Sequence, residues 1–421
     1  MCDSVVAVGP ETRTGVSLFG KNSDRKPGER QPFVQHAAAH HPRDSRVRCT
    51  HVEIPQVGST YRVMGHSPWW VWGFEHGVNE HAVAIGNHTV FSNEPLDDEP
   101  GLIGMDLVRL GLERGRDARE TLEAIASLLE RHGQGGAALE PDGAGYHNSF
   151  LIADPREAWV LETSNRRWAA RRVTRAACSN HLSIGSDWEI RSRDLEPFAR
   201  EQGWWSDDRR FDVAGAYRNP HVPARISLGR HRRTRALLDR GAGAHDVASL
   251  EALLRDHDAG GTVWSGAGTT PDEERFFTVC AHSAPVHETT ASLIAPLPEE
   301  RPGPWPVWIS FGTPCTGVFL PVYLDGVLPA SLARADDGAF DAFARLQRAA
   351  ASDWTHGTPR VREGFAELEA WVERERIEIE RAALAAAVVR DADVATEILT
   401  RFMERTVGEA LACAETIAKQ L

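Results

Sequence analysis

The sequence has few cysteines, and no two of them are closely spaced. Its 421 residues include six, which are Cys2, Cys49, Cys178, Cys280, Cys315 and Cys413. The lack of a C-x-x-C pair argues against a zinc ribbon, and the wide scatter argues against the disulfide framework of a small secreted domain. We therefore expect reduced thiols, as in a cytoplasmic protein.

Recognisable metal motifs are also missing. The 18 histidines form no H-E-x-x-H sequence and no regularly spaced set with the cysteines. His40 and His41 lie in a polar stretch, where solvated side chains are the simpler interpretation. We expect neither a bound metal nor a cofactor.

Long apolar runs and an excess of basic residues are absent as well. No run approaches the ~18 apolar residues that a transmembrane helix needs, and no basic and then apolar leader precedes Cys2. The formal net charge of −13 argues against a nucleic-acid surface, which needs a basic stripe, and against an anionic membrane surface. These absences predict a cytoplasmic protein that binds neither nucleic acid nor membrane.

What the chain does contain is typical of a globular protein, with 42% hydrophobic and 25% charged residues. Because 421 residues are long for one compact core, we expect a core domain at 1–330 and a helical extension at 331–421. Apolar spacings of three and four predict helices over 340–351, from 365 onward and over 394–411. The extension is expected to pack on the core or on another subunit of a homo-oligomer.

Strand and helix patterns are mixed in the core region, which by itself indicates only an α+β fold. Turn residues between the apolar runs 149–153 and 158–163 predict a hairpin. Helical spacing over 118–129, with Asp117 as N-cap, predicts a helix. The four large rings within 69–74 predict a buried core strand, and the alternative is an apolar wall of a substrate pocket.

The N-terminus carries the first candidate for catalysis. Cys2 directly follows Met1, and an initiator methionine is normally trimmed before a residue this small. Trimming would leave one residue with a thiol and an α-amine, and such an amine titrates near ~7.7–8.0 and can act as the base for the thiol. By position alone the simpler interpretation is that Cys2 has no role, because a single cysteine near a terminus is a weak motif.

The residues that follow Cys2 favour a catalytic role for it. Cys2–Ser4, the strand-like run 5–8, the turn 11–15 and the sequence Phe-Gly-Lys-Asn-Ser-Asp-Arg at 19–25 resemble the secernin and cysteine dipeptidase family, peptidase family C69. That family belongs to the N-terminal nucleophile hydrolases and is related to penicillin V acylase and bile salt hydrolase. The resemblance spans roughly residues 2–325. It implies a four-layer αββα sandwich, to which the C-terminal helical extension is added.

The resemblance also implies roles for residues near Cys2. Asp24 is expected to hydrogen-bond the Cys2 α-amine and tune it. Lys21 stands where the related acylases have arginine; it should keep a positive charge that lowers the pKa of the thiol, without the bidentate fork of a guanidinium.

Two asparagines match the family later in the chain. Residues 77–87 are similar to its G-x-N-E-x-G…I-G-N signature, with Ala82 in place of the usual glycine, and this implies that Asn87 contributes to the oxyanion hole. Without the match, Asn87 would be a strand-end residue capping backbone groups. Residues 178–184 resemble the family's I-S-N-x-L-S-I run, which implies that the Asn180 side-chain amide donates to the oxyanion.

The most basic run and the last strands complete the resemblance. Related acylases place an arginine near the nucleophile in the region of 230–235, and Arg232 is our choice of register, with Arg230 next. The stretches 276–282, 289–294 and 306–314 resemble core strands of the second sheet. Within the first of them, Cys280 and His282 are two apart on a strand, roughly ~6.5–7 Å along the backbone, so we interpret them as a core pair and not as a catalytic pair.

These inferences favour a thiol peptidase that hydrolyses an amide bond, in particular that of a dipeptide or short peptide. Cys2 would attack the carbonyl, Asn87 and Asn180 would hold the oxyanion, and water would release the thioester. One alternative is an N-acyl amide acylase, or an acyltransferase in which an amine replaces water. Another is a non-catalytic secernin-like interaction protein, because a fold can persist without turnover.

Overall fold

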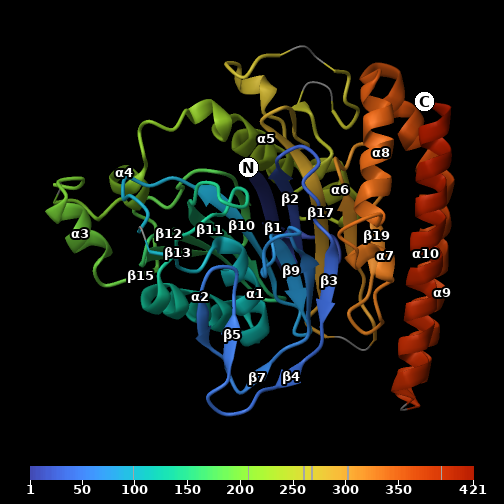
Figure 1. The fold of residues 1–421 in the computed structure, drawn as a ribbon, viewed down its shortest axis with the longest axis horizontal. Coiled ribbons are helices and arrows are strands. Elements are labelled where there is room, and N and C mark those ends of the chain that lie inside the picture. Colours follow the sequence, from blue (N-terminus) through green and yellow to red (C-terminus); the bar gives the residue numbers. More distant parts are fainter. Residues whose placement is uncertain (98, 207, 259–260, 267–268, 301–302, 390) are drawn as a thin grey trace.

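The core of the protein is a pair of antiparallel sheets that face each other (Figure 1). The structure is a computed structural model that describes residues 1–97, 99–206, 208–258, 261–266, 269–300, 303–389 and 391–421. The first sheet has the order β14 (Arg175–Cys178), β1 (Cys2–Ala7), β2 (Ser17–Arg25), β17 (His287–Leu297), β18 (Val307–Phe311) and β19 (Leu320–Val322), and β16 (His282–Ser283) pairs with β17. The second has the order β15 (Ile190–Arg191), β13 (Arg167–Val173), β12 (Ala158–Ser164), β11 (His147–Ala153), β10 (Ala84–Val90), β9 (His76–Asn79), β8 (Val63–His66) and β3 (Phe33–His36).

Helices cover the outer face of each sheet. The helices α5 (Leu228–Arg240) and α6 (Val247–Leu254) pack on the first sheet, and α1 (Gly104–Arg114) and α2 (Ala118–His132) pack on the second. The order of layers is therefore αββα, which confirms the predicted fold. Local sequence sets the helix starts, because Asp117 accepts a hydrogen bond from the Glu120 N–H at the start of α2, and Asp246 caps α6 in the same way.

Several smaller elements before residue 330 lie outside the two sheets. They are the ribbons β4 (Ala39–His40) with β7 (Ser59–Thr60) and β5 (Arg46–Arg48) with β6 (Glu53–Pro55), the helices α3 (Leu195–Glu201) and α4 (Val213–Tyr217), and the 3-10 turns Gly9–Glu11, Ala224–Ile226 and Glu274–Phe276.

The hairpin of β1 and β2 lies in the centre of the first sheet and positions the N-terminus. Every residue of both strands is buried. Cys2 pairs with Ser23, and Val5 pairs with Gly20. The second strand of this hairpin, β2, extends to Arg25. This extension brings Asp24 beside the first residues of the chain.

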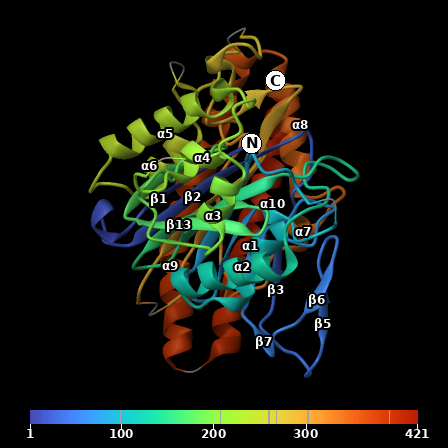
Figure 2. The same cartoon turned by 90° about the vertical axis from the view of Figure 1, so that its left-hand side faces the viewer.

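The C-terminal region is helical, as the sequence predicts. It contains α7 (Ala330–Ala333), α8 (Ala339–Ala351), α9 (Trp354–Val388) and α10 (Ala392–Gln420), and α9 and α10 run side by side (Figures 1 and 2). Their buried side chains, Phe343 and Phe402 among them, belong to the same apolar cluster as Val5 of β1. The boundary near residue 330 stays a prediction. Among the described helices, none is both long and apolar enough to cross a membrane.

The aromatic run 69–74 is not a strand, so that prediction is wrong, and the run does not line the cavity described below. Its rings serve separate purposes along an irregular segment. Phe74 is buried, Trp69 is 58% exposed, and Trp72 lies against the guanidinium of Arg109 at 3.9 Å. Gly73 allows the segment to lie on α1, since a Cβ there would come within 2.1 Å of the Met105 backbone.

Candidate active site

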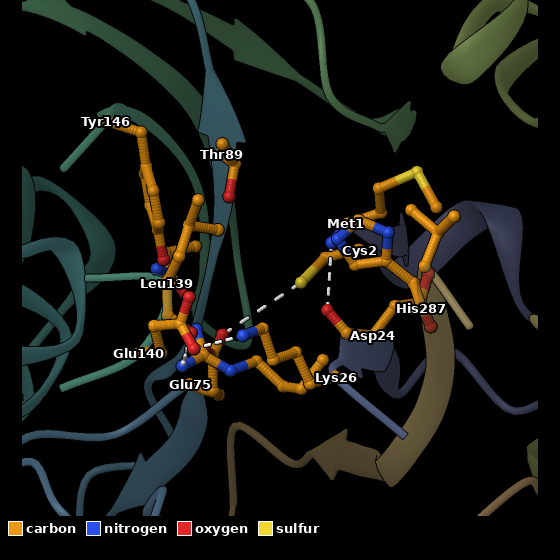
Figure 3. A pocket seen from close by; sticks show the side chains of 13 residues that line it. Met1, Cys2, Asp24, Lys26, Glu75, Thr89, Leu139, Glu140, Tyr146 and His287 are labelled. Atoms are coloured by element: carbon orange, nitrogen blue, oxygen red, sulfur yellow. Dashed lines mark hydrogen bonds and ion pairs between the residues drawn. The ribbon is translucent and has the colours of Figure 1, made fainter. Parts of the chain in front are cut away.

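A small cavity opens where β1 begins (Figure 3). It offers about 180 Å³ of space that water-sized molecules can enter. Met1, Cys2, Asp24 and His287 come from the first sheet and its flanking turn, and Glu75, Thr89, Leu139 and Tyr146 form the facing wall. The cavity thus lies between strands of both sheets, with the predicted nucleophile in one of its walls.

Cys2 is buried, and its backbone nitrogen and its thiol both have partners. Its backbone nitrogen donates to Asn180 Oδ1 at 2.9 Å, and its Sγ lies 3.9 Å from Glu75 Oε2. Burial raises the pKa of the Cys2 thiol, whereas the Lys21 ammonium acts in the opposite direction. In the chain that retains Met1 the effect of burial is larger than that of Lys21, so the pKa of the thiol is raised overall.

Met1 extends the β1–β2 ladder by one pair. Its α-amine donates to the Asp24 carbonyl at 2.8 Å, and the Asp24 N–H donates to the Met1 carbonyl at 2.9 Å. Burial lowers the pKa of this α-amine. The Met1 side chain packs in an apolar niche formed by Phe276, Phe277 and Ile226. The first residue of the chain is therefore fixed at the cavity wall.

Asp24 has one carboxylate oxygen without a partner. Its Oδ1 accepts a hydrogen bond from Thr289 Oγ1 at 2.7 Å. Its Oδ2 is buried, has no hydrogen-bond partner within the described chain, and lies 3.7 Å from Arg230 Nη1. Burial raises the pKa of Asp24 to about 6, although the nearby N-terminal amine and Arg230 oppose the shift. An acceptor is thus available beside the N-terminus.

Asn180 contacts Cys2 in a way that the sequence did not predict. Its Oδ1 accepts from the Cys2 nitrogen and, at 2.6 Å, from Arg230 Nη2. Its Nδ2, the atom expected at the oxyanion, donates to the Thr89 carbonyl at 2.9 Å. The structure therefore places Asn180 beside the nucleophile with its acceptor, and not its donor, toward Cys2.

The arginine of the site is Arg230, and the choice of Arg232 is corrected. Arg230 is fully buried and forms ion pairs with Asp3 and Asp24. The Arg232 side chain is 63% exposed and pairs with Glu274 at the surface. Two residues along a helix turn the side chain by roughly 200°, so the two arginines lie on opposite faces of α5.

Lys21 and Asn87 meet at Glu75, a residue that sequence reasoning missed. Lys21 Nζ donates to the Glu75 carbonyl at 2.8 Å and lies 3.2 Å from its Oε2, and Arg25 contacts Oε1 at 3.1 Å. In the amide orientation that gives its nitrogen acceptors, Asn87 donates to the Glu75 carbonyl and Oε2, each at 2.9 Å. Burial would raise the pKa of Glu75, but Lys21 and Arg25 lower it overall.

This density of buried charge is itself informative. Removing an ion from water costs several kcal/mol even when it is paired, so buried charge clusters are weak contributors to stability and frequent at functional sites. Here Lys21, Arg25 and Arg230 face Asp3, Asp24 and Glu75 around one thiol, and all six side chains are buried. The arrangement can supply a nucleophile, a nearby amine, an acceptor that orients this amine and amide donors.

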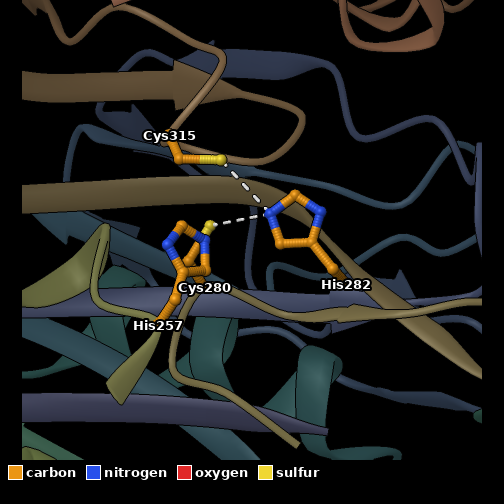
Figure 4. A group of neighbouring side chains, drawn as sticks. All are labelled: His257, Cys280, His282 and Cys315. Carbon is orange, nitrogen blue, oxygen red and sulfur yellow. Dashed lines mark hydrogen bonds between the residues drawn. The ribbon is translucent and has the colours of Figure 1, made fainter. Parts of the chain in front are cut away.

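A second group of reactive side chains lies apart from this cavity. His257, Cys280, His282 and Cys315 converge with their ligand atoms within 4.8 Å of one another (Figure 4). Cys280 and His282 were predicted to be a core pair, and no metal was expected. The pair is part of a larger cluster that could hold an ion.

Comparison with known families defines the class of protein. The model of Peptidase family C69 matches residues 3–226, which places the chain among hydrolases of peptide or amide bonds. Because this match covers more than half of the sequence, the chain belongs to peptidase family C69.

Several solved structures are distantly similar. The C2A mutant of the conjugated bile acid hydrolase from Clostridium perfringens is 14% identical with a TM-score of 0.44, over 74% of this chain and 89% of that chain. Penicillin V acylase from Agrobacterium tumefaciens is 12% identical with a TM-score of 0.43, over 76% and 84%. A Caenorhabditis elegans ortholog of N-acylethanolamine-hydrolyzing acid amidase is 12% identical with a TM-score of 0.36, over 71% and 94%.

Proposed function

We propose that the protein is a cysteine-type dipeptidase whose nucleophile is Cys2, exposed by removal of Met1. The observation that carries this proposal is the pairing of Met1 with Asp24 at the cavity wall. Loss of Met1 turns the backbone nitrogen of Cys2 into an α-amine. That nitrogen already donates to Asn180 Oδ1 and lies in the wall that contains the thiol.

The proton transfers follow from this placement. The neutral α-amine takes the thiol proton, and the thiolate forms a bond to the substrate carbonyl carbon. The resulting ammonium gives its proton to the leaving amine as the C–N bond breaks, which leaves a thioester on Cys2. Water, deprotonated by the same amine, then attacks the thioester, and the acid product departs as the thiol is restored. Asp24 Oδ2 and Asn180 Oδ1 are the acceptors that would orient the amine.

We assign the oxyanion to Asn87. Its Nδ2 lies beside Glu75 Oε2, which in turn lies 3.9 Å from Cys2 Sγ. An N–H of this amide that turns from Glu75 to the substrate can stabilise charge on a carbonyl oxygen, and one such donor is typically worth about 10²–10³ in kcat. Asn180 is assigned to the amine, since its Oδ1 already accepts a hydrogen bond from the Cys2 nitrogen.

The size of the cavity and the charges in its lining favour a small substrate that carries both a positive and a negative charge. Lys26 and Glu140 form an ion pair among the residues that line it, and both are about half exposed. A free dipeptide carries one carboxylate and one ammonium, which these two side chains can bind separately. The niche of Phe276, Phe277 and Ile226, which Met1 occupies before its removal, suits an apolar side chain of the substrate.

The test is hydrolysis of a dipeptide panel by the purified full chain, with N-acetylated and C-amidated forms of each dipeptide as controls. We expect cleavage of free dipeptides, a preference for one apolar residue, and loss of rate when either end is blocked. Glu140→Gln should reduce the penalty for the acetylated form, and Lys26→Met the penalty for the amidated form. Preferential cleavage of N-acyl substrates would instead make the protein an acylase.

A further inference from the structure

We propose that His257, Cys280, His282 and Cys315 bind one zinc ion that has a structural role. The four side chains come from three segments. His257 lies in the turn after α6, Cys280 and His282 lie just before and at the start of β16, and Cys315 lies in the loop after β18. Figure 4 shows them pointing toward a common centre. The site does not depend on the proposed function of Cys2.

The separations between these side chains match a tetrahedral site. His282 Nε2 lies 3.2 Å from Cys315 Sγ and 3.6 Å from Cys280 Sγ. Zinc bonds of about 2.0–2.1 Å to nitrogen and ~2.3 Å to sulfur give ligand-to-ligand distances of roughly 3.3–3.8 Å in a tetrahedron. The four ligand atoms lie within 4.8 Å of one another, so an ion at the centre needs only small movements of the side chains.

His257 is already oriented as a ligand. Its Nδ1 is 3.1 Å from the Gly261 carbonyl, which fixes the proton on Nδ1 and leaves Nε2 as a lone-pair donor. That Nε2 is buried and has no hydrogen-bond partner among the residues that the structure describes. A buried polar atom without a partner costs free energy, and a metal bond supplies the missing interaction.

The ligand set selects the ion and its role. Two thiolates and two imidazoles are a common structural zinc set, and four protein ligands leave no open position for a substrate. Binding of one Zn²⁺ by two thiols and two neutral imidazoles releases two protons, so the bound centre carries no net charge. A neutral centre suits this environment, because Cys280 and Cys315 are fully buried and the Trp264 ring stacks on His282 at 4.7 Å.

The zinc would tie together segments that have little regular structure. His282 also contacts Trp354, the first residue of α9, at 4.7 Å, so the site joins the core to the C-terminal helices. The cluster is also connected to the cavity through two hydrogen bonds. Ala281, between two of the ligands, donates to Thr289 Oγ1 at 2.9 Å, and Thr289 donates to Asp24. Thr289 and Asp24 are thus positioned in part by the segment that the metal would hold.

The experiment is elemental analysis of the full chain purified without chelators and then reconstituted with Zn²⁺. We expect one zinc per chain in the wild type, a loss of at least tenfold in bound zinc in Cys280→Ala and in Cys315→Ala, and no loss in Cys178→Ala. Cys178 is the matched control, since it is also a buried free cysteine but lies outside the cluster.

A second measurement guards against variants that fail to fold. Wild-type protein loaded with Co²⁺ should show the ligand-field bands of a tetrahedral cobalt site and thiolate-to-cobalt charge transfer. Folded wild-type protein that binds less than a tenth of an equivalent of zinc, or that shows an octahedral cobalt spectrum, would overturn the proposal. A Cys280–Cys315 disulfide found by mass spectrometry in freshly reduced and reconstituted protein would overturn it as well.

Discussion

Replacing Asp24 by asparagine should separate catalysis from stability. In the proposed mechanism, Asp24 Oδ2 accepts a hydrogen bond from the Cys2 α-amine. Its charge also interacts with Arg230 at 3.7 Å. At an effective dielectric constant of about 20, that ion pair alone corresponds to about 4 kcal/mol of attraction. Loss of this negative charge should lower the pKa of the α-amine. The amine is then a weaker and less well oriented base, so we expect kcat to fall by about 10²–10⁴.

Stability should change in the opposite direction. The pKa of Asp24 is raised from its ordinary value of 3.8 to about 6, so the folded state favours the protonated carboxyl. The stability that this preference contributes is fully present below the unfolded pKa and is lost as the pH rises through about 6. A neutral asparagine at position 24 retains this contribution to stability at pH 7. The variant should therefore be more stable than the wild type at pH 7 by up to about 3 kcal/mol, and this advantage should disappear near pH 4.

The assay is dipeptide hydrolysis as a function of pH, with urea unfolding at pH 7 and pH 4 on the same preparations. Wild-type activity should fall as Asp24 is protonated below about pH 6, and Asp24→Asn should lack this acid limb. Iodoacetamide should still label Cys2 in the variant. Wild-type kcat in Asp24→Asn would refute the assigned role, and a variant that is both inactive and less stable at pH 7 would show that Asp24 is a structural residue.

Two further predictions compare neighbouring residues that differ in their assigned roles. Cys2→Ser should lower dipeptide turnover by orders of magnitude while Cys178→Ser keeps most of it, and equal activities would place the nucleophile elsewhere. Arg230→Gln should lower the free energy of unfolding in urea by about 3–5 kcal/mol, because it leaves Asp3 buried without its partner. Arg232→Gln should change that free energy by less than about 0.5 kcal/mol, because Arg232 is exposed. A larger loss of stability in Arg232→Gln than in Arg230→Gln would contradict the burial of Arg230.

Local chemistry made much of the fold predictable. The starts of α2 and α6 follow from Asp117 and Asp246, whose side chains need only the next three residues to form their caps. The layered fold was implied by the family resemblance, whose motifs are spread over roughly residues 2–325. The strand predicted at 69–74 was wrong, because a high content of aromatic residues does not by itself specify a strand. Here one ring is buried, one lies against an arginine and one is exposed to solvent.

The site was only partly predictable. Periodicity favours Arg230, since Thr234 and Leu238 continue its buried stripe at intervals of four on α5, and Arg232 breaks that stripe. Glu75 carries no signal in the sequence, because it becomes a site residue only where Lys21 reaches it across the sheets. The Cys/His cluster was hidden for the same reason, as its members are brought together by tertiary packing and not by spacing.

The role of Cys2 as nucleophile is tested most directly by intact mass spectrometry of active protein, before and after brief mixing with a cleaved dipeptide and an acid quench. We expect a chain that begins at Cys2 and, after mixing, an acyl adduct that peptide mapping places on Cys2. Active protein that retains Met1, or an adduct on another residue, would contradict it.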